Sequence, residues 1–377
     1  MSTLEVKDVS KLYRTGTFGG ELKPALRGVS FEIGEGEVVS LIGQSGSGKS
    51  TLGKIILRLT PLSAGMVTFE GTDIAGLDRA ALRGYYRQVQ GVFQDPFSSY
   101  NPLYKADRVF EMVRTVYFSD MRPPSWRAKV DDALASVALN PADVLNKYPH
   151  QLSGGQQQRL LIARALLLQV KLLVADEIIS MLDASTRVDV LNLLVDLKRK
   201  GLGILFITHD LSLGNYISDK AVILRAGAVV EMGETPQVFG NPQHSYTKSL
   251  LGAVPQLHRK WDGLGAEVTA GANGSGANGS GANGGNSTPG DGANRPSSTG
   301  SSAPARPAGG ALRPGHGGRA LPPGPGPRIS LMDMPDAAWR RRTRTPRPRP
   351  ESVLAASRPP ELVELEKGHF VAVETED

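Results

Sequence analysis

The chain has 377 residues, of which 43 are lysine or arginine, 37 are aspartate or glutamate and none is cysteine. Residues 1–258 hold 28 basic and 25 acidic side chains and the remainder holds 15 and 12, so neither part has the charge excess of a dedicated nucleic-acid binder. The lack of cysteine excludes disulfide bonds, thiolate zinc sites, iron–sulfur clusters and a cysteine nucleophile.

The N-terminal part combines two kinds of extended segment. Residues 4–6, 29–33 and 66–70 have the pattern of antiparallel strands separated by turns. Val38–Ile42 is a short apolar run, which is typical of a strand buried in a parallel sheet. The first residues lack the apolar core of a secretion signal, and no run of 18 apolar residues follows, so we expect an intracellular protein without a membrane span.

A glycine-rich turn follows Val38–Ile42 and fits the phosphate-loop pattern G-x-x-x-x-G-K-[ST]. Its glycines allow backbone N–H groups to converge on phosphate oxygens, and the helical run behind it, Leu52–Leu59, presents its positive end to them. We expect Lys49 to reach the β- and γ-phosphates and the Ser50 hydroxyl to bind Mg²⁺. The residues predicted to bind a nucleoside triphosphate are Gly43, Gln44, Ser45, Gly46, Ser47, Gly48, Lys49, Ser50 and Thr51.

Between residues 96 and 152 the apolar period becomes helical, which predicts a helical insertion in the sheet domain. Gln94 lies just before this insertion, where a carboxamide is placed to contact metal or water and to report the nucleotide state to the insertion. The predicted buried faces are Val109, Met112, Val113 and Val116 on one helix and Val130, Leu134 and Val137 on another.

Three apolar runs in the second half predict further core strands. Leu172–Ala175 is followed by Asp176 and Glu177. In a phosphate-loop enzyme the first acid would hold Mg²⁺ through water, and the second would polarise the attacking water. Ile204–Thr208 is followed by His209, and Ala221–Leu224 is predicted to form a hairpin with the next extended run.

The segment Gln151–Arg159 contains Leu-Ser-Gly-Gly-Gln and resembles the signature motif of ATP-binding cassette (ABC) ATPases. The order of elements is also similar to that family: phosphate loop, Gln94, signature segment, Asp176-Glu177, Ser180–Asp183 and His209. The resemblance covers about residues 3–255. It implies an α/β fold of the P-loop NTPase (RecA-like) class, with a parallel-sheet core, an N-terminal antiparallel β subdomain and a helical subdomain at about residues 96–165.

The resemblance also implies roles for individual residues. A hydroxyl and a backbone N–H at the start of a helix, from Ser153 and Gly155, form an anion-binding arrangement. In the family this arrangement caps the γ-phosphate bound by the opposite subunit, so ATP is held between two subunits. Tyr13 resembles the aromatic residue that stacks on adenine, and His209 resembles the histidine that contacts the γ-phosphate. The implied catalytic residues are Lys49, Gln94, Glu177 and His209, the metal-binding residues are Ser50, Gln94 and Asp176, and the residues that reach across the dimer are Ser153, Gly154, Gly155, Gln156 and Asp183.

One departure from the family follows the two acids. The family usually has proline and threonine or similar small residues where this chain has Ile178 and Ile179. Proline fixes φ and removes a backbone donor, so isoleucine changes the backbone preference beside Glu177. Because the residues that carry the chemistry are retained, we expect active hydrolysis and leave the geometry of Ser180–Asp183 open.

Three segments are similar to ATPases that serve dipeptide and oligopeptide importers. They are Phe93–Pro102, the run Asn241–Thr247 with Leu250-Leu251 and Val254-Pro255 behind it, and the terminal pieces Pro360–Glu364 and Gly368–Val371. Ser245 stands where these relatives usually have proline. Many of them carry cysteines for a metal–sulfur cluster near this end, and the lack of cysteine excludes such a cluster here.

A low-complexity region separates the last two of these segments. Residues 263–327 contain 19 glycines and 9 prolines, which predicts a disordered linker. Six arginines between Arg340 and Arg349 are interpreted as a solvated basic spacer, with contact to anionic lipid or RNA as the alternative. We therefore divide the chain into a nucleotide-binding domain (1–257), a linker (258–350) and a C-terminal segment (351–377), in which Leu362–Val373 is expected to pack back as a strand.

The function implied by the resemblance is that of an ATP-hydrolysing importer subunit. It would use ATP and Mg²⁺, lie peripherally at the cytoplasmic face of the membrane and drive import of a di- or oligopeptide or a similar solute. Its partners would be two transmembrane permeases, a second homologous ATPase or a second copy and, indirectly, an extracytoplasmic solute-binding protein, with no nucleic acid.

Three alternatives remain open at this point. An ABC exporter ATPase shares the signature segment, but the Asn241–Thr247 run argues against it. A soluble ABC ATPase of translation or DNA repair needs no membrane partner, but such proteins usually carry two cassettes, a coiled coil or a zinc insertion. A structural subunit with a dead site is disfavoured by the retained Lys49, Asp176, Glu177 and His209.

Overall fold

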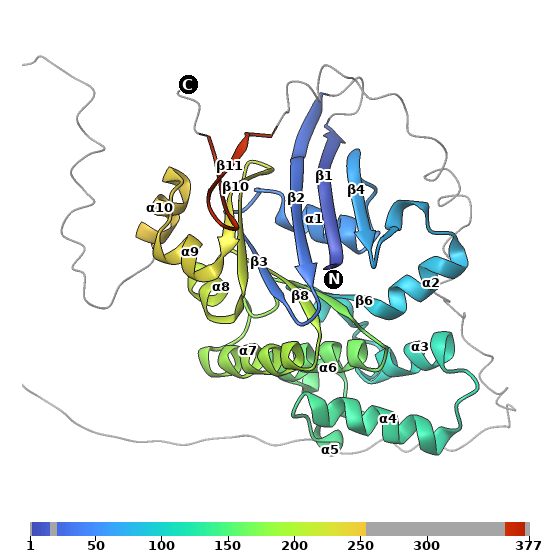
Figure 1. Cartoon of the computed structure of the whole chain (residues 1–377). Helices are drawn as coiled ribbons and strands as arrows, with labels where there is room; N and C mark the ends of the chain where they lie inside the picture. Colours follow the sequence, from blue (N-terminus) through green and yellow to red (C-terminus); the bar gives the residue numbers. More distant parts are fainter. Residues whose placement is uncertain (1, 16–20, 254–358, 374–377) are drawn as a thin grey trace, which may run out of the picture. The chain divides into compact units, whose positions relative to one another are not determined.

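The computed structural model of the chain describes residues 2–15, 21–253 and 359–373 (Figure 1). The predicted linker and the arginine cluster lie outside the described residues. The strands are β1 (Ser2–Arg14), β2 (Leu22–Gly34), β3 (Val38–Ile42), β4 (Ala64–Phe69), β5 (Thr72–Asp73), β6 (Val89–Val92), β7 (Leu172–Asp176), β8 (Gly203–Thr208), β9 (Lys220–Arg225), β10 (Ala228–Glu234), β11 (Leu362–Glu366) and β12 (His369–Ala372). The α-helices are α1 (Lys49–Ile56), α2 (Arg79–Gln88), α3 (Arg108–Tyr117), α4 (Pro123–Ser136), α5 (Pro141–Val144), α6 (Gly154–Leu166), α7 (Ala184–Arg199), α8 (Leu211–Ile217), α9 (Thr235–Gly240) and α10 (Ser245–Gly252).

The N-terminal strands form the antiparallel sheet that the sequence predicts, in the order β2-β1-β4-β5. The strands β1 and β2 are much longer than the short segments predicted from apolar residues. Their pairing continues through several register shifts, among them one between Val6 and Val9, where the pairing passes Asp8 with its φ of +49°. Bulges of this kind interrupt the alternation of apolar and polar residues, so the sequence pattern hides the continuity of the strand.

The core sheet has eight strands in the order β11-β12-β10-β9-β3-β8-β7-β6, and the run from β9 to β6 is parallel. Its parallel strands are buried on both faces, which explains their unbroken apolar runs. In β7, for example, Leu172 and Val174 face the cluster that contains α1, whereas Leu173 and Ala175 face the cluster that contains α6 and α7. The α/β fold expected from the sequence is thereby confirmed.

The region between β6 and β7 is helical, and its helices α3 to α6 lie on the same side of the sheet as α7 (Figure 1). The predicted face of α3 is partly wrong, because Met112 is 45% exposed and Phe110 is buried in its place beside Val113. The spacing of apolar residues in the sequence cannot show which of two adjacent helix faces is buried when both faces carry apolar side chains. In α3 the larger Phe110 takes the core position. The second predicted face is correct: Val130 and Leu134 of α4 are buried, as is Val137.

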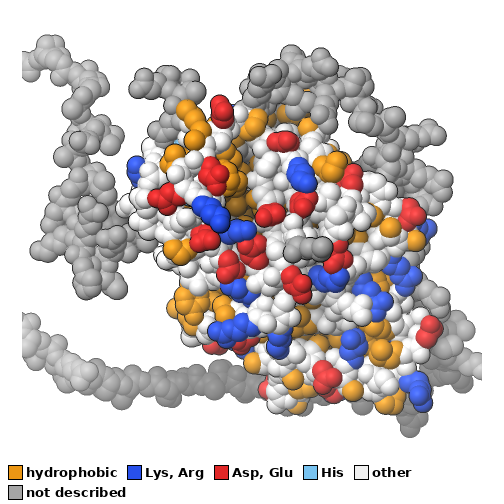
Figure 2. Space-filling model, viewed as in Figure 1, with side chains coloured by type: hydrophobic (Ala, Val, Ile, Leu, Met, Phe, Trp, Pro, Cys, Tyr) orange, Lys and Arg blue, Asp and Glu red, His pale blue; other side chains and the backbone are white. Residues whose placement is uncertain are grey.

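The C-terminal segment pairs with the core sheet although more than a hundred residues precede it after α10. Strands β11 and β12 form an antiparallel hairpin, and β12 adds to the edge strand β10 through the pairs Glu231–Val371 and Met232–Phe370. The hairpin and the core sheet belong to one compact unit. On the face shown in Figure 2, acidic and basic side chains are interspersed with apolar ones rather than gathered by sign. In the described part of the chain, the helices are too short or too polar to cross a bilayer.

Candidate functional site

The phosphate loop connects the end of β3 to the start of α1. Gly46 and Gly48 adopt φ values of +81° and +106°, a backbone region that glycine enters at little cost. A side chain at Gly48 would place its Cβ 2.5 Å from the carbonyl oxygen of Ala25, and one at Gly43 would overlap the carbonyl oxygen of Leu224. The loop therefore requires glycine for both conformation and space. It leaves a backbone cradle at a helix N-terminus, the arrangement that binds phosphate.

Lys49 is the cation of this cradle. Its Nζ donates hydrogen bonds to the carbonyl oxygens of Gly43 (2.7 Å) and Gln44 (2.9 Å), so the ammonium is held inside the loop. Burial lowers the pKa of Lys49, while the carboxylates of Glu177 and Asp176 oppose this shift. The ammonium is thus poorly solvated before any nucleotide binds, which strengthens its attraction for an incoming phosphate.

Asp176 ends β7, and this strand brings it next to the loop. The Ser50 hydroxyl donates to Asp176 Oδ1 at 3.2 Å, which joins two oxygen groups that are 126 residues apart in sequence. Burial raises the pKa of Asp176, and the charge of Glu177 raises it further, whereas the hydrogen bond from Ser50 lowers it. A cation at this position would relieve the unfavourable burial of the carboxylate.

Glu177 and His209 meet at the ends of neighbouring parallel strands. His209 Nδ1 lies 3.1 Å from Glu177 Oε1. Glu177 has a φ of +50°, which is uncommon for a residue with a side chain, and its N–H donates to the carbonyl oxygen of Ile207. The carboxylate lines a cavity of about 70 Å³ together with Ser180, Thr208 and His209, which is enough room for water. The arrangement suits a base that polarises a water molecule.

The signature segment forms the start of α6. Ser153 is the N-cap residue, and its side-chain oxygen accepts a hydrogen bond from the N–H of Gln156, whose side chain in turn accepts from the N–H of Ser153. A Cβ on Gly155 would overlap the methyl group of Thr186, so α6 and α7 approach as closely as they do because this residue is glycine. Among the described residues, no hydrogen bond or ion pair joins α6 to the phosphate loop of the same chain.

Asp183 caps α7. Its carboxylate accepts hydrogen bonds from the backbone and hydroxyl of Thr186 and from the hydroxyl of Ser185, and these bonds lower its pKa to about 2. Arg187, one helical turn later, donates to the carbonyl oxygens of Leu182 and Ser180 and so fixes the loop before α7. Sequence reasoning missed Arg187, because its partners are backbone carbonyl oxygens and no spacing of side chains marks such contacts.

Two predicted site residues remain apart from this cluster. Tyr13 is the second-last residue of β1, 40% of its surface is exposed, and Lys11 Nζ lies 5.0 Å from its ring centre. The ring is available for stacking, but among the described residues no hydrogen bond or ring contact joins it to the phosphate loop. Gln94 is exposed two residues after β6, and within the described residues no hydrogen bond or ion pair ties its side chain to Asp176 or Glu177.

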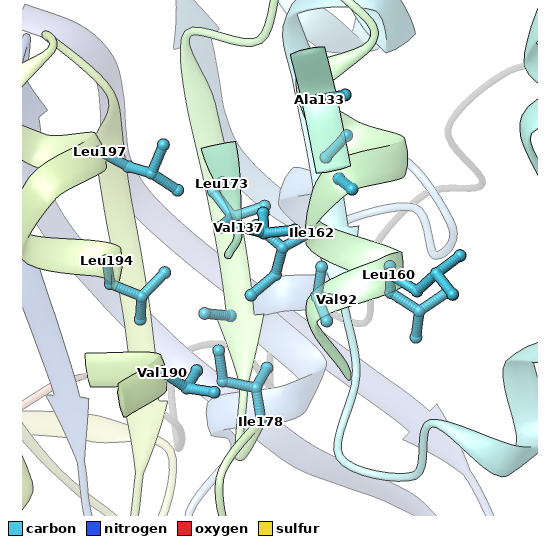
Figure 3. Close-up of a cluster of buried hydrophobic side chains, with 14 of the residues drawn as sticks. Val92, Ala133, Val137, Leu160, Ile162, Leu173, Ile178, Val190, Leu194 and Leu197 are labelled. Carbon is cyan, nitrogen blue, oxygen red and sulfur yellow. The ribbon is translucent and has the colours of Figure 1, made fainter. Parts of the chain in front are cut away.

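The isoleucines after the two acids are part of the core. Ile178 and Ile179 are almost fully buried, and Figure 3 shows Ile178 in the same cluster as Val190 and Leu194 of α7. The backbone beside Glu177 is therefore held by apolar packing at the position where proline would restrict it. The two isoleucines that depart from the family pattern thus have a structural role as core residues beside the turn at Glu177.

The variant Ile178→Ala should measure this packing. Removing a buried isoleucine side chain is expected to lower the free energy of unfolding by about 2–5 kcal/mol, because contacts are lost and a cavity remains. Val188→Ala is the matched control, since Val188 is half-exposed on α7 and its loss should change the stability by less than about 0.5 kcal/mol. Equal midpoints of the two variants in urea unfolding would show that Ile178 contributes no packing.

Comparisons with known proteins agree with this geometry. Residues 26–180 match the ABC transporter family, and residues 230–278 match the family described as oligopeptide/dipeptide transporter, C-terminal region. The chain is 43% identical over 254 residues to the oligopeptide transport ATP-binding protein OppF of Streptococcus mutans, covering 67% of this chain and 82% of OppF. It is 38% identical over 262 residues to the dipeptide transport ATP-binding protein DppF of Escherichia coli, covering 68% and 77% of the two chains.

A solved structure shares the fold. The dimeric ATP-binding cassette MJ0796, in a post-hydrolysis state bound to ADP and Pi, superposes with a TM-score of 0.55 at 32% identity, covering 62% of this chain and 98% of MJ0796. The phosphate cradle, the adjacent acids Asp176 and Glu177 and the helix-capping signature segment are the parts of such an ATPase. On these grounds the chain belongs to the family of ABC transporter ATP-binding proteins, which bind and hydrolyse ATP.

Proposed function

We propose that this protein is the ATPase subunit of an importer for di- or oligopeptides or similar solutes. The observation that carries the proposal is the match of residues 230–278 to the C-terminal region of oligopeptide/dipeptide transporters, because this region is separate from the general ATPase motifs. The printed functions of OppF and DppF, oligopeptide and dipeptide transport, support the same class of solute. An exporter ATPase would share the signature segment, and this additional match disfavours it.

In this proposal Mg²⁺ accompanies ATP and is held by the Ser50 hydroxyl, by Gln94 and, through water, by Asp176. All three offer oxygen donors of the kind that Mg²⁺ prefers, and Ser50 and Asp176 already lie within hydrogen-bond distance of each other. In the described part of the chain no cluster of three or more histidine, aspartate or glutamate side chains could hold a metal ion by itself. The ion would thus take its other ligands from the phosphates and water, as Mg²⁺ commonly does at nucleotide sites.

The site is proposed to be completed by a second subunit. Ser153, Gly154, Gly155 and Gln156 present the start of α6 to an anion, and Asp183 lies at the start of α7 beside them. Since no hydrogen bond joins α6 to the loop among the described residues, the γ-phosphate that it caps would belong to the opposite subunit. The dimeric state of MJ0796 supports this arrangement, with either a second copy or a homologous ATPase in the second position.

The helical region is proposed to contact two transmembrane permeases at the cytoplasmic face of the membrane. Three apolar side chains, Leu103, Tyr104 and Met112, are exposed in or beside α3, and Leu103 is 79% exposed. Exposed apolar residues that gather in one region are typical of protein interaction sites. Gln94 precedes this region and would connect it to the nucleotide.

Co-purification followed by transport tests the proposal. We expect tagged Glu177→Gln protein, added to native membranes with ATP and Mg²⁺, to retain two polytopic permeases and a second ATPase. The double variant Lys49→Met, Glu177→Gln is the control, because it should not bind nucleotide and should therefore not retain these partners.

A transport assay follows. Reconstituted with these permeases and their solute-binding protein in vesicles, the wild-type protein should drive ATP-dependent uptake of a labelled dipeptide or oligopeptide. Recovery of ribosomal or DNA-repair proteins without a membrane protein, or ATP-driven movement in the outward direction, would contradict the import proposal.

A further inference from the structure

Helix α10 contacts the phosphate loop directly. The N–H of Gln44 donates a hydrogen bond to the hydroxyl oxygen of Tyr246 at 3.2 Å, across 202 residues of sequence. The guanidinium of Arg225, at the end of β9, lies 5.2 Å from the centre of the Tyr246 ring. The motif Asn241–Thr247 therefore supplies a side chain, that of Tyr246, to the phosphate loop.

Tyr246 is held by a chain of buried polar groups. His244 caps α10, because its Nδ1 accepts a hydrogen bond from the N–H of Tyr246 at 3.0 Å. The N–H groups of Gln243 and His244 both donate to the carboxylate of Glu231 in β10, at 2.8 and 3.1 Å. Glu231 is fully buried, so these donors replace water around its charge.

The C-terminal hairpin completes this chain of contacts. His369 Nε2, at the start of β12, lies 2.8 Å from Glu231 Oε1, and the histidine is as deeply buried as the carboxylate. A buried carboxylate that loses a partner is strongly destabilised, so the position of Glu231 depends on His369 as well as on the two backbone donors. The hairpin is thereby connected through Glu231 and His244 to Tyr246.

The contact at Gln44 has a specific consequence for nucleotide binding. Gln44 is held from two directions: its N–H by Tyr246, and its carbonyl oxygen by Lys49 Nζ at 2.9 Å. A phosphate would compete with this carbonyl for Lys49 Nζ, and the hydrogen bond to Tyr246 would then still hold the first turn of the loop. A loop that is already ordered loses less conformational entropy on binding.

We propose that Tyr246 is a positioning residue of the nucleotide site, supported through Glu231 by His369 of the C-terminal hairpin. The hairpin would then be part of the framework that orders the phosphate loop. This inference concerns nucleotide affinity and is independent of the solute that the transporter carries.

The test is a comparison of two tyrosine variants of the full chain. Tyr246→Phe removes one hydroxyl at the loop, and Tyr216→Phe removes one hydroxyl that donates to Asn192 Oδ1 on the surface, at 2.9 Å. With Mg-ADP as the probe, which avoids ATP-driven closure of the dimer, titration calorimetry should show about three- to tenfold weaker binding for Tyr246→Phe, the effect of one hydrogen bond, and no change for Tyr216→Phe. The kcat at saturating ATP should stay within about twofold of wild type, while KM rises.

A second pair of variants tests the link to the hairpin. His369→Leu removes the donor to Glu231 and should weaken Mg-ADP binding, whereas His369→Gln, which retains a donor, should restore much of the affinity. In the Tyr246→Phe background His369→Leu should have little further effect, because both changes act through the same contact. Equal affinities of Tyr246→Phe and Tyr216→Phe would overturn the proposal, and full additivity of Tyr246→Phe and His369→Leu would overturn the part played by the hairpin. Neither result bears on import, because no permease takes part.

Discussion

Replacing Glu177 by glutamine is expected to lower the rate of ATP hydrolysis by about two to four orders of magnitude while nucleotide binding is retained. Glu177 directly follows β7, lines a cavity with room for water and is 3.1 Å from His209 Nδ1. Glutamine keeps the shape and the hydrogen-bonding capacity of this side chain but cannot accept a proton from the attacking water. The loss should therefore appear in kcat.

Steady-state phosphate release, measured together with the affinity for ATP, checks this expectation. The matched control is Glu70→Gln, because Glu70 lies at the turn between β4 and β5 and forms an exposed ion pair with Lys171. Exposed pairs contribute little to stability, so this variant should hydrolyse ATP as the wild type does. If Glu177→Gln retained more than a tenth of the wild-type kcat, a different group would have to serve as the base.

The second large effect is expected for Lys49→Met, which should lower ATP hydrolysis by about 100- to 1000-fold and abolish tight nucleotide binding. Methionine keeps an apolar chain of similar length but removes the ammonium of Lys49, a residue that is only 5% exposed. The phosphate loop then loses its only side-chain cation among the residues Gly43–Thr51. Unlike Glu177→Gln, this variant should fail already at the binding step, which separates the two roles.

Lys54→Met is the control for this prediction. Lys54 lies on the same helix α1, five residues later, and its side chain is exposed. Loss of an exposed lysine should leave both ATP affinity and kcat within about twofold of wild type. Tight Mg-ATP binding by Lys49→Met, measured by equilibrium dialysis, would show that backbone groups alone hold the phosphates.

Much of the site could be predicted because its parts are contiguous in sequence. The loop Gly43–Thr51 needs glycine at Gly46 and Gly48 for positive φ and places Lys49 at the start of a helix, and each of these requirements is visible in nine consecutive residues. The buried strands could be predicted for the same reason, since a strand covered on both faces must be apolar along its whole length. The face of α3 is predicted only in part, because Met112 and Phe110 compete for the core and only packing chooses between them.

The sequence by itself therefore determined the chemistry available to this protein: a phosphate loop, two acids, a histidine and a signature helix, each specified by neighbouring residues. The tertiary structure decided which of these groups meet. The strand order places β7, β8 and β3 side by side, so Asp176 reaches Ser50 and Glu177 reaches His209. The same sheet, extended by β12, brings His369 to Glu231, and the packing of α10 places the Tyr246 hydroxyl against Gln44 of the phosphate loop. Local sequence cannot specify contacts between residues more than a hundred positions apart, because they depend on how all the strands pack together.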